Sequence, residues 1–208
     1  MTKKRQDNEF WRRQARRYDR AIDLLNRRFD QMAIDVAAEV EGAQVLEIAA
    51  GTGLVTRRLV ARAEQVVATD QSVEMLDILR ARMKEIGAHN VETKIADATE
   101  LPFENASFDA VVMANLIHLL PSPMQALVEA QRVLRPGGVL CIPTFCHGET
   151  ALARVVSRIL GVVRFPVVTR FSGDTLAMLV EDAGYSLVKH STYSGMLPIA
   201  SIVARRPS

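Results

Sequence analysis

The strongest constraint on the fold is an alternation that runs from Gln44 to the end of the chain. Short runs rich in β-branched residues alternate there with longer stretches of helical periodicity, a pattern typical of βαβ units and a parallel sheet. The expected strands are 44–49, 66–70, 91–96, 108–113, 139–142, 186–193 and 200–205. The expected helices are 54–63, 72–86, 123–134 and 174–183. The sequence therefore predicts an α/β fold.

Several residues mark the ends of these elements. Helix caps are expected at Ser72, at the pair Ser122-Pro123, and at Ser172 or else Gly173-Asp174. Gly87 and Gly184 follow helical stretches and suit left-handed C-caps. Pro143 would remove a ladder donor, so we expect the fifth strand to end or bulge there. The segment 132–140 (RVLRPGGVL) is typical of a helix end, a turn and a strand.

Composition excludes several classes of protein. Apolar residues make up 49% of the chain and charged residues 24%, which does not fit a disordered, collagen-like or disulfide-scaffold chain. The two cysteines, Cys141 and Cys146, imply no disulfide framework and fit a reducing cytoplasm. The amino terminus lacks the apolar stretch of a signal peptide, and no charge-free apolar run reaches the roughly 18 to 20 residues that span a bilayer. We therefore expect a cytoplasmic protein.

The first expected strand leads into a glycine turn. A cofactor that crosses such a turn needs backbone without Cβ atoms in its path, and the N–H groups of the following helix favour an anionic group. A dinucleotide fingerprint should close with Gly or Ala at position 56, where Thr56 stands. The alternative pattern, acidic-x-Gly-x-Gly-x-Gly, is met by Glu47, Ala49, Gly51 and Gly53, with one Gly replaced by Ala.

Carboxylates follow the next two expected strands. Asp70 closes the second strand at the carboxyl edge of the sheet, where it can accept hydrogen bonds from both ribose hydroxyls. It can equally cap the helix that begins near Ser72. Asp97 comes just after the third strand and can accept from an adenine amino group while the N–H of Ala98 faces a ring nitrogen. Both acids favour a nucleotide-type cofactor over a purely structural turn.

These motifs occur in the order and spacing of the class I S-adenosylmethionine-dependent methyltransferases, which the chain resembles over about residues 8–205. It looks most like the branch that includes the ubiquinone and menaquinone biosynthesis methyltransferases. The resemblance implies a Rossmann-like, doubly wound sheet of seven strands, mostly parallel with the last strand antiparallel, and helices on both faces. It also implies S-adenosylmethionine as the cofactor and S-adenosylhomocysteine as its product.

The resemblance carries cofactor-binding roles onto particular residues. The methionine moiety would be surrounded by Glu47, Ala49, Gly51 and Gly53. The nucleoside would be held by Asp70 at the ribose, by Gln71 and Met75 beside the adenine, and by Asp97 and Ala98 at its edge. The remaining contacts would come from Asn115, after the fourth strand, and from Tyr18, in an amino-terminal Tyr-Asp element that folds over the cofactor. Ala49 departs from the family's Gly and puts in question how closely the cofactor approaches the backbone there.

With 208 residues, the chain has the length of one ordinary domain. Residues 1–40 are expected to form an amino-terminal helical cap, since apolar residues recur there at spacings of three and four. Residues 41–147 would form the cofactor-binding core, and 148–171 an insertion or lid. Residues 172–208 would supply the final helix and antiparallel strands.

Methyl transfer is an in-line displacement on a sulfonium, so alignment and exclusion of water can supply much of the catalysis. A base is needed only if the acceptor must lose a proton. His118 is a candidate base or acceptor-binding residue, or else a structural histidine. Tyr18 is a candidate catalytic residue, or else a core aromatic of its helix. His147 is a candidate acceptor-binding residue, and its spacing from Cys141 and Cys146 matches no metal site, so no metal is expected.

Charge divides the chain into two unlike parts. Residues 1–28 hold ten Lys and Arg against four Asp and Glu, a formal charge of +6, whereas the whole chain carries +2 and the remainder therefore −4. The basic side chains of residues 1–28 can simply be solvated, or they can bind anionic lipid together with the apolar segment 151–165. A weaker resemblance to bacterial phospholipid N-methyltransferases, through the Tyr-Asp helix and the tail 195–199, favours lipid. Nucleic acid is an unlikely partner because aromatic residues make up only 5%.

We therefore expect a methyltransferase that acts on a small or lipid-like acceptor, such as a phospholipid or a quinone-type compound. Two alternatives stay open. One is an NAD(P)-dependent oxidoreductase, which Thr56 disfavours. The other is an S-adenosylmethionine-binding regulator without transfer activity.

Overall fold

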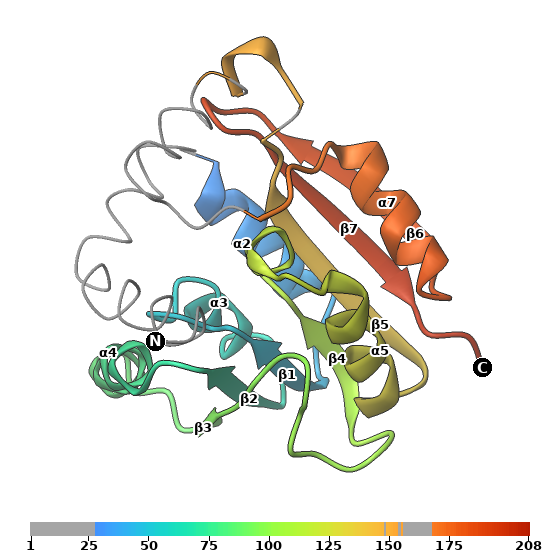
Figure 1. Ribbon diagram of the computed structural model, residues 1–208. Helices are drawn as coiled ribbons and strands as arrows, with labels where there is room; N and C mark the ends of the chain where they lie inside the picture. The colour runs from blue at the N-terminus through green and yellow to red at the C-terminus, as the bar shows by residue number, and fades with distance from the viewer. Residues whose placement is uncertain (1–27, 148, 154, 156–167) are drawn as a thin grey trace, which may run out of the picture.

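The computed structural model describes residues 28–147, 149–153, 155 and 168–208. Within these residues one sheet has the strand order β3-β2-β1-β4-β5-β7-β6. Its strands are β1 (Gln44–Ile48), β2 (Gln65–Asp70), β3 (Val91–Ile95), β4 (Phe108–Val112), β5 (Leu134–Phe145), β6 (Ser186–Tyr193) and β7 (Ile199–Arg205). The first five strands pair in parallel, and β7 pairs antiparallel with both β5 and β6. The expected seven-stranded sheet with an antiparallel last strand is confirmed (Figure 1).

Helices cover both faces of this sheet. They are α2 (Phe29–Ala38), α3 (Thr56–Leu59), α4 (Val73–Glu85), the 3₁₀ helix η1 (Ile117–Leu119), α5 (Pro123–Val133) and α7 (Gly173–Asp182). Successive strand residues point to opposite faces. Val45 and Val112 therefore pack in one core with α2, α3 and α4, while Leu46 and Val111 pack in a second core with α5 and α7. Figure 1 shows α5 and α7 together on one side of the sheet.

The expected end or bulge of the fifth strand at Pro143 is wrong. β5 continues to Phe145, and Pro143 pairs with Ser201 of β7. The carbonyl of Pro143 accepts from the N–H of Asn115 at 2.8 Å, on the β4 side. In a strand, the N–H and C=O of one residue point to the same side, so the missing donor also faces the β4 side, past Val112, where β4 has ended. The antiparallel ladder with β7 therefore loses no hydrogen bond.

The start of β5 and the extent of α3 also differ from expectation. β5 begins at Leu134, directly after α5, and its register with β4 jumps from Leu134 to Val139. The Pro-Gly-Gly segment is therefore an irregularity inside the strand. The helix expected over 54–63 is one turn, Thr56–Leu59, continued by hydrogen-bonded turns in which the N–H groups of Arg62 and Ala63 donate to Leu59.

Of the expected amino-terminal helical cap, the part from residue 28 onward lies within the described residues and contains α2. The buried residues of α2 are Phe29, Met32, Ala33, Val36 and Ala37, the spacing of a helix with one apolar face. Asp30 on this helix accepts from Arg57 at 2.8 Å and from Arg58 at 2.6 Å, which ties α2 to α3. Tyr18 and most of the basic segment lie outside the described residues. In the part of the chain that is described, every helix is too short or too polar to cross a bilayer.

The expected helix caps are largely confirmed. The Oγ of Ser72 accepts from the N–H of Met75 at 3.2 Å at the start of α4. Ser172 forms a capping box with Thr175 at the start of α7. Gly87 and Gly184 follow α4 and α7 with φ of 69° and 84°. Pro123 opens α5, but Ser122 before it makes no side-chain cap bond.

The contrast between two serines provides a test of these caps. Ser72→Ala should lower the free energy of unfolding by about 1 kcal/mol, because it removes the acceptor of the first turn of α4. Ser122→Ala is the matched control and should change it by less than about 0.5 kcal/mol. Urea denaturation of both variants measures the difference, and equal losses would contradict the assigned cap.

Candidate functional site

The glycine turn after β1 has left-handed backbone at three positions. The φ angles of Ala49, Gly51 and Gly53 are 59°, 57° and 87°. A Cβ on Gly53 would stand 3.0 Å from Cγ of Leu79, whereas nothing lies within 4 Å of the corresponding position on Gly51. The turn is thus closed by packing at Gly53 and open beside Gly51. Ala49 adopts a conformation that costs an L-residue on the order of 1–2 kcal/mol, which accounts for the Gly that the motif has there.

Asp70 joins this turn to the next helix. Its Oδ2 accepts from the N–H of Gly51 at 2.9 Å, and its Oδ1 accepts from the N–H of Ser72 at 2.9 Å. Burial raises the pKa of Asp70, and the donors Ser72 and Gly51 partly oppose that rise. The cap of α4 is therefore Ser72, which accepts from Met75, while Asp70 holds the N–H of this cap residue. Because a carboxylate offers about four acceptor positions, two such bonds leave capacity for the hydroxyls of a ligand.

A second carboxyl group lies under the turn. Glu47 is 1% exposed, and its Oε2 accepts from the hydroxyl of Thr56 at 2.6 Å. Burial raises the pKa of Glu47 to about 8, with Thr56 lowering it and Asp70 raising it. Thr56 thus does more than depart from the dinucleotide fingerprint, because it supplies a donor to the motif's acid. That role was missed by sequence reasoning.

The other residues that are expected to contact the nucleoside lie at the same edge of the sheet. The N–H of Ala96 donates to the carbonyl of Asp70 at 3.1 Å, which brings the end of β3 beside the end of β2. Oδ1 of Asp97 then accepts from both the N–H and the hydroxyl of Thr99, at 2.9 and 2.8 Å. Ala98 and Met75 are buried, and Gln71 is half-buried. The contacts of these residues with an adenine remain predictions.

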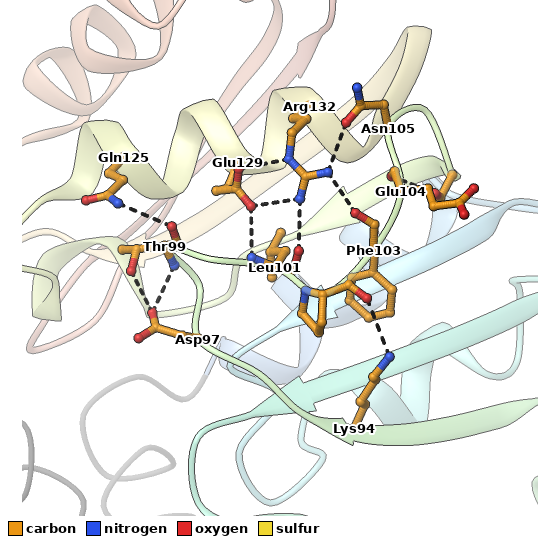
Figure 2. A network of polar contacts seen from close by, with 12 residues as sticks. Lys94, Asp97, Thr99, Leu101, Phe103, Glu104, Asn105, Gln125, Glu129 and Arg132 are labelled. Carbon is orange, nitrogen blue, oxygen red and sulfur yellow. Dashed lines mark hydrogen bonds and ion pairs between the residues drawn. The ribbon is translucent and has the colours of Figure 1, made fainter.

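The loop after Asp97 is clamped to α5 by an ion pair that sequence reasoning did not find (Figure 2). Glu129 accepts from the N–H of Leu101 at 2.8 Å. Arg132 donates to the carbonyls of Leu101 and Phe103, at 2.9 and 2.7 Å, and to Glu129. The Arg132 guanidinium lowers the pKa of Glu129. The only sequence signal is an acid and an arginine three residues apart on the helix before the Pro-Gly-Gly segment.

Asn115 follows β4 with a left-handed φ of 53°. Its Oδ1 accepts from the N–H of Phe145 at 3.2 Å, and its own N–H donates to Pro143. The side chain therefore joins the ends of β4 and β5. Its expected position along the cofactor stays a prediction.

His118 and His147 are brought together by the ends of β4 and β5. Their ring centroids are 5.2 Å apart, and both side chains are buried. Nδ1 of His118 shares a hydrogen bond of 2.8 Å with the hydroxyl of Thr144. Neither ring nitrogen of His147 has a hydrogen-bond partner among the described residues. Burial, helped by His147, lowers the pKa of His118 to about 3, and burial, helped by Arg170, lowers the pKa of His147 to about 4.

The two cysteines of β5 and its end are buried thiols. Burial raises the pKa of Cys141 and of Cys146 to about 12, so both are protonated at neutral pH. Among the described residues, no three His, Cys, Asp or Glu side chains gather in a way that could hold a metal ion.

Glu47 should make stability depend on pH. Its pKa is 4.5 as a free group and about 8 in the folded chain, so the folded chain holds the extra proton between these values. The stabilisation is complete below about pH 4.5 and is lost as the pH rises to about 8, at up to about 1.4 kcal/mol per pH unit. Glu47→Gln should remove this slope in urea denaturation between about pH 5 and 8, whereas the exposed control Glu92→Gln should keep it. Parallel profiles for wild type and Glu47→Gln would contradict the assignment.

Comparison with known proteins agrees with this geometry. Residues 46–142 match a family described as a methyltransferase domain. A demethylmenaquinone methyltransferase from Clavibacter sepedonicus is 39% identical over 141 residues, which span 66% of this chain and 57% of that relative. Another from Renibacterium salmoninarum is 30% identical over 206 residues, with 88% of this chain and 85% of that relative covered.

The fold has solved counterparts. A SAM-dependent methyltransferase from Aquifex aeolicus superposes with a TM-score of 0.72 at 20% identity, over 94% of this chain and 98% of that chain. At this identity the likeness concerns the fold, while the match to the Renibacterium relative establishes the family. The chain belongs to the class I S-adenosylmethionine-dependent methyltransferases and resembles their ubiquinone and menaquinone biosynthesis branch.

Proposed function

We propose that this chain transfers a methyl group from S-adenosylmethionine to a small, apolar, quinone-type acceptor. The observation that carries the transfer is the turn at which the Asp70 carboxylate meets the N–H of Gly51, beside open space. The acceptor class is supported by the two relatives described above, both demethylmenaquinone methyltransferases.

The chemistry of the turn fits the cofactor part by part. Asp70 is an acceptor at the strand end and suits a pair of ribose hydroxyls. Glu47 would lie near the methionine moiety, where a cationic amino group would favour its ionised form. Asp97 would accept from the adenine amino group. The bound cofactor supplies a methyl group on a sulfonium, and the protein aligns the acceptor and excludes water.

A methyl-transfer assay tests this function. Purified protein, S-adenosylmethionine labelled in the methyl group and a short-chain demethylmenaquinol should yield a labelled quinol. Asp70→Ala should weaken cofactor binding by about 1.5–3 kcal/mol, the value of charge-assisted hydrogen bonds. Asp77→Ala, at an exposed Asp that pairs with Arg80 on the same helix α4, is the matched control.

Calorimetry in parallel separates the alternatives. Binding of NAD(P) without binding of S-adenosylmethionine would favour the oxidoreductase. Binding of S-adenosylmethionine with no transfer to quinol or phospholipid would favour the regulatory protein. Cofactor affinity that is unchanged in Asp70→Ala would show that the site is misassigned.

We also propose that the basic segment 1–28, nearly all of which lies outside the described residues, brings the chain to anionic lipid. The charge of +6 supports this proposal, since each Lys or Arg near an anionic surface contributes about 1 kcal/mol. Co-sedimentation should be stronger with vesicles that contain anionic phospholipid than with neutral ones, and it should fall as salt is added. Equal, negligible binding to both kinds of vesicle would remove the proposal.

A further inference from the structure

We propose that His147 is the polar contact that recognises the methyl acceptor, and that the group it binds is a hydroxyl on an uncharged ring. This inference rests on the proposed methyl transfer and assigns to His147 the recognition of a hydroxyl on its quinone-type acceptor.

The position of His147 suits an acceptor site. In an open α/β sheet, ligands bind outside the carboxyl ends of the parallel strands. β4 and β5 are parallel neighbours, with Val112 opposite Cys141, so their carboxyl ends meet at one edge. His118 follows β4 there, and His147 follows β5. The cofactor turn follows β1, which is the other neighbour of β4. The histidine pair is therefore one strand away from the turn in the same edge of the sheet.

His147 has unused hydrogen-bonding capacity. Both of its ring nitrogens are buried without a partner among the described residues. A buried polar group left unpaired is destabilising, and such groups are rare in native proteins. The neighbouring ring of His118 does not supply the bond, because its Nδ1 is shared with Thr144 and the two rings meet at a tilt of 47°. Thr144 thus anchors His118, and His118 supports His147 by ring contact.

The protonation state of His147 selects the chemistry of its partner. Burial, helped by the guanidinium of Arg170, lowers the pKa of His147, so the ring is neutral. The ring of His118 beside it is also buried and neutral. Glu149, two residues along the chain, is engaged with the N–H of Gly173 at 2.9 Å. A neutral imidazole has one N–H donor and one acceptor nitrogen.

A hydroxyl can pair with either nitrogen of that ring, because it can both donate and accept. An ammonium group only donates and the phosphodiester of a phospholipid only accepts, so each could meet only one of the two nitrogens and would place a charge against a buried neutral ring. The surroundings are also apolar, with Ile117 and Phe145 buried beside the pair and the ring of Phe145 centred 6.5 Å from that of His118. These observations favour a quinol over a phospholipid headgroup.

Equilibrium binding tests the inference without relying on turnover. The probes are 1,4-dihydroxynaphthalene and its 1,4-dimethoxy analogue, which cannot donate, each titrated anaerobically into the protein saturated with S-adenosylhomocysteine. Wild type should bind the dihydroxy compound at least about 10-fold more tightly, the effect of one lost hydrogen bond in a buried site. His147→Phe should lose this preference, whereas His147→Gln, which keeps a donor and an acceptor, should retain part of it.

Controls separate recognition from folding and from function. His89→Phe, at an exposed histidine, should behave as wild type. His147→Phe should keep its affinity for S-adenosylhomocysteine and its melting temperature, because it replaces an unpaired polar ring by an apolar one. A wild type that does not discriminate between the probes, or a His147→Phe that still does, overturns the inference. Discrimination that depends on His147, without methylated product from any quinol, would instead overturn the proposed function and leave the recognition site standing.

Discussion

The hydrogen bonds of the Asp70 carboxylate connect three parts of the molecule. One oxygen holds the N–H of Gly51, in the turn after β1, and the other holds the N–H of Ser72, at the start of α4. A parallel sheet places the ends of β1 and β2 side by side but does not determine the path of the chain beyond them. The Asp70 carboxylate fixes the path of the chain after both strands, because it bonds to the turn after β1 and to the start of α4. It lies where the cofactor's ribose is expected.

Polar groups concentrate at this edge of a sheet whose two faces are packed with apolar side chains. Glu47, Asn115 and His118 are all buried there, and each has a partner from a neighbouring segment: Thr56, Phe145 and Thr144. Such pairing is what burial of polar groups requires. His147 is the exception among the described residues, and a ligand that supplies its hydrogen-bond partner would account for it.

The loop that carries Asp97 depends on a different support. Asp97 accepts from Thr99 in a local turn, and Gln125 of α5 donates to the carbonyl of Thr99 at 3.3 Å. Arg132 and Glu129 reach it from α5 through the backbone of Leu101 and Phe103 (Figure 2). An arginine fits this task because its planar group donates in several directions at once. Two residues about 30 positions further along the chain thus hold the loop that carries Asp97, the expected adenine contact.

The sequence by itself determined the alternation of helix and strand along the chain, the caps at Ser72 and Ser172, and the glycine turn with its acids. These features depend on local periodicity and on backbone preferences, which neighbouring residues express directly. It misjudged Pro143, because whether a missing N–H matters depends on which neighbour it faces. Tertiary structure alone decided that Thr56 meets Glu47, that Arg132 clamps the loop after β3, and that His147 lies beside His118 with no hydrogen-bond partner in the part of the chain that is described. Those contacts join residues far apart in the chain or separated by a turn, and only folding brings their side chains within reach.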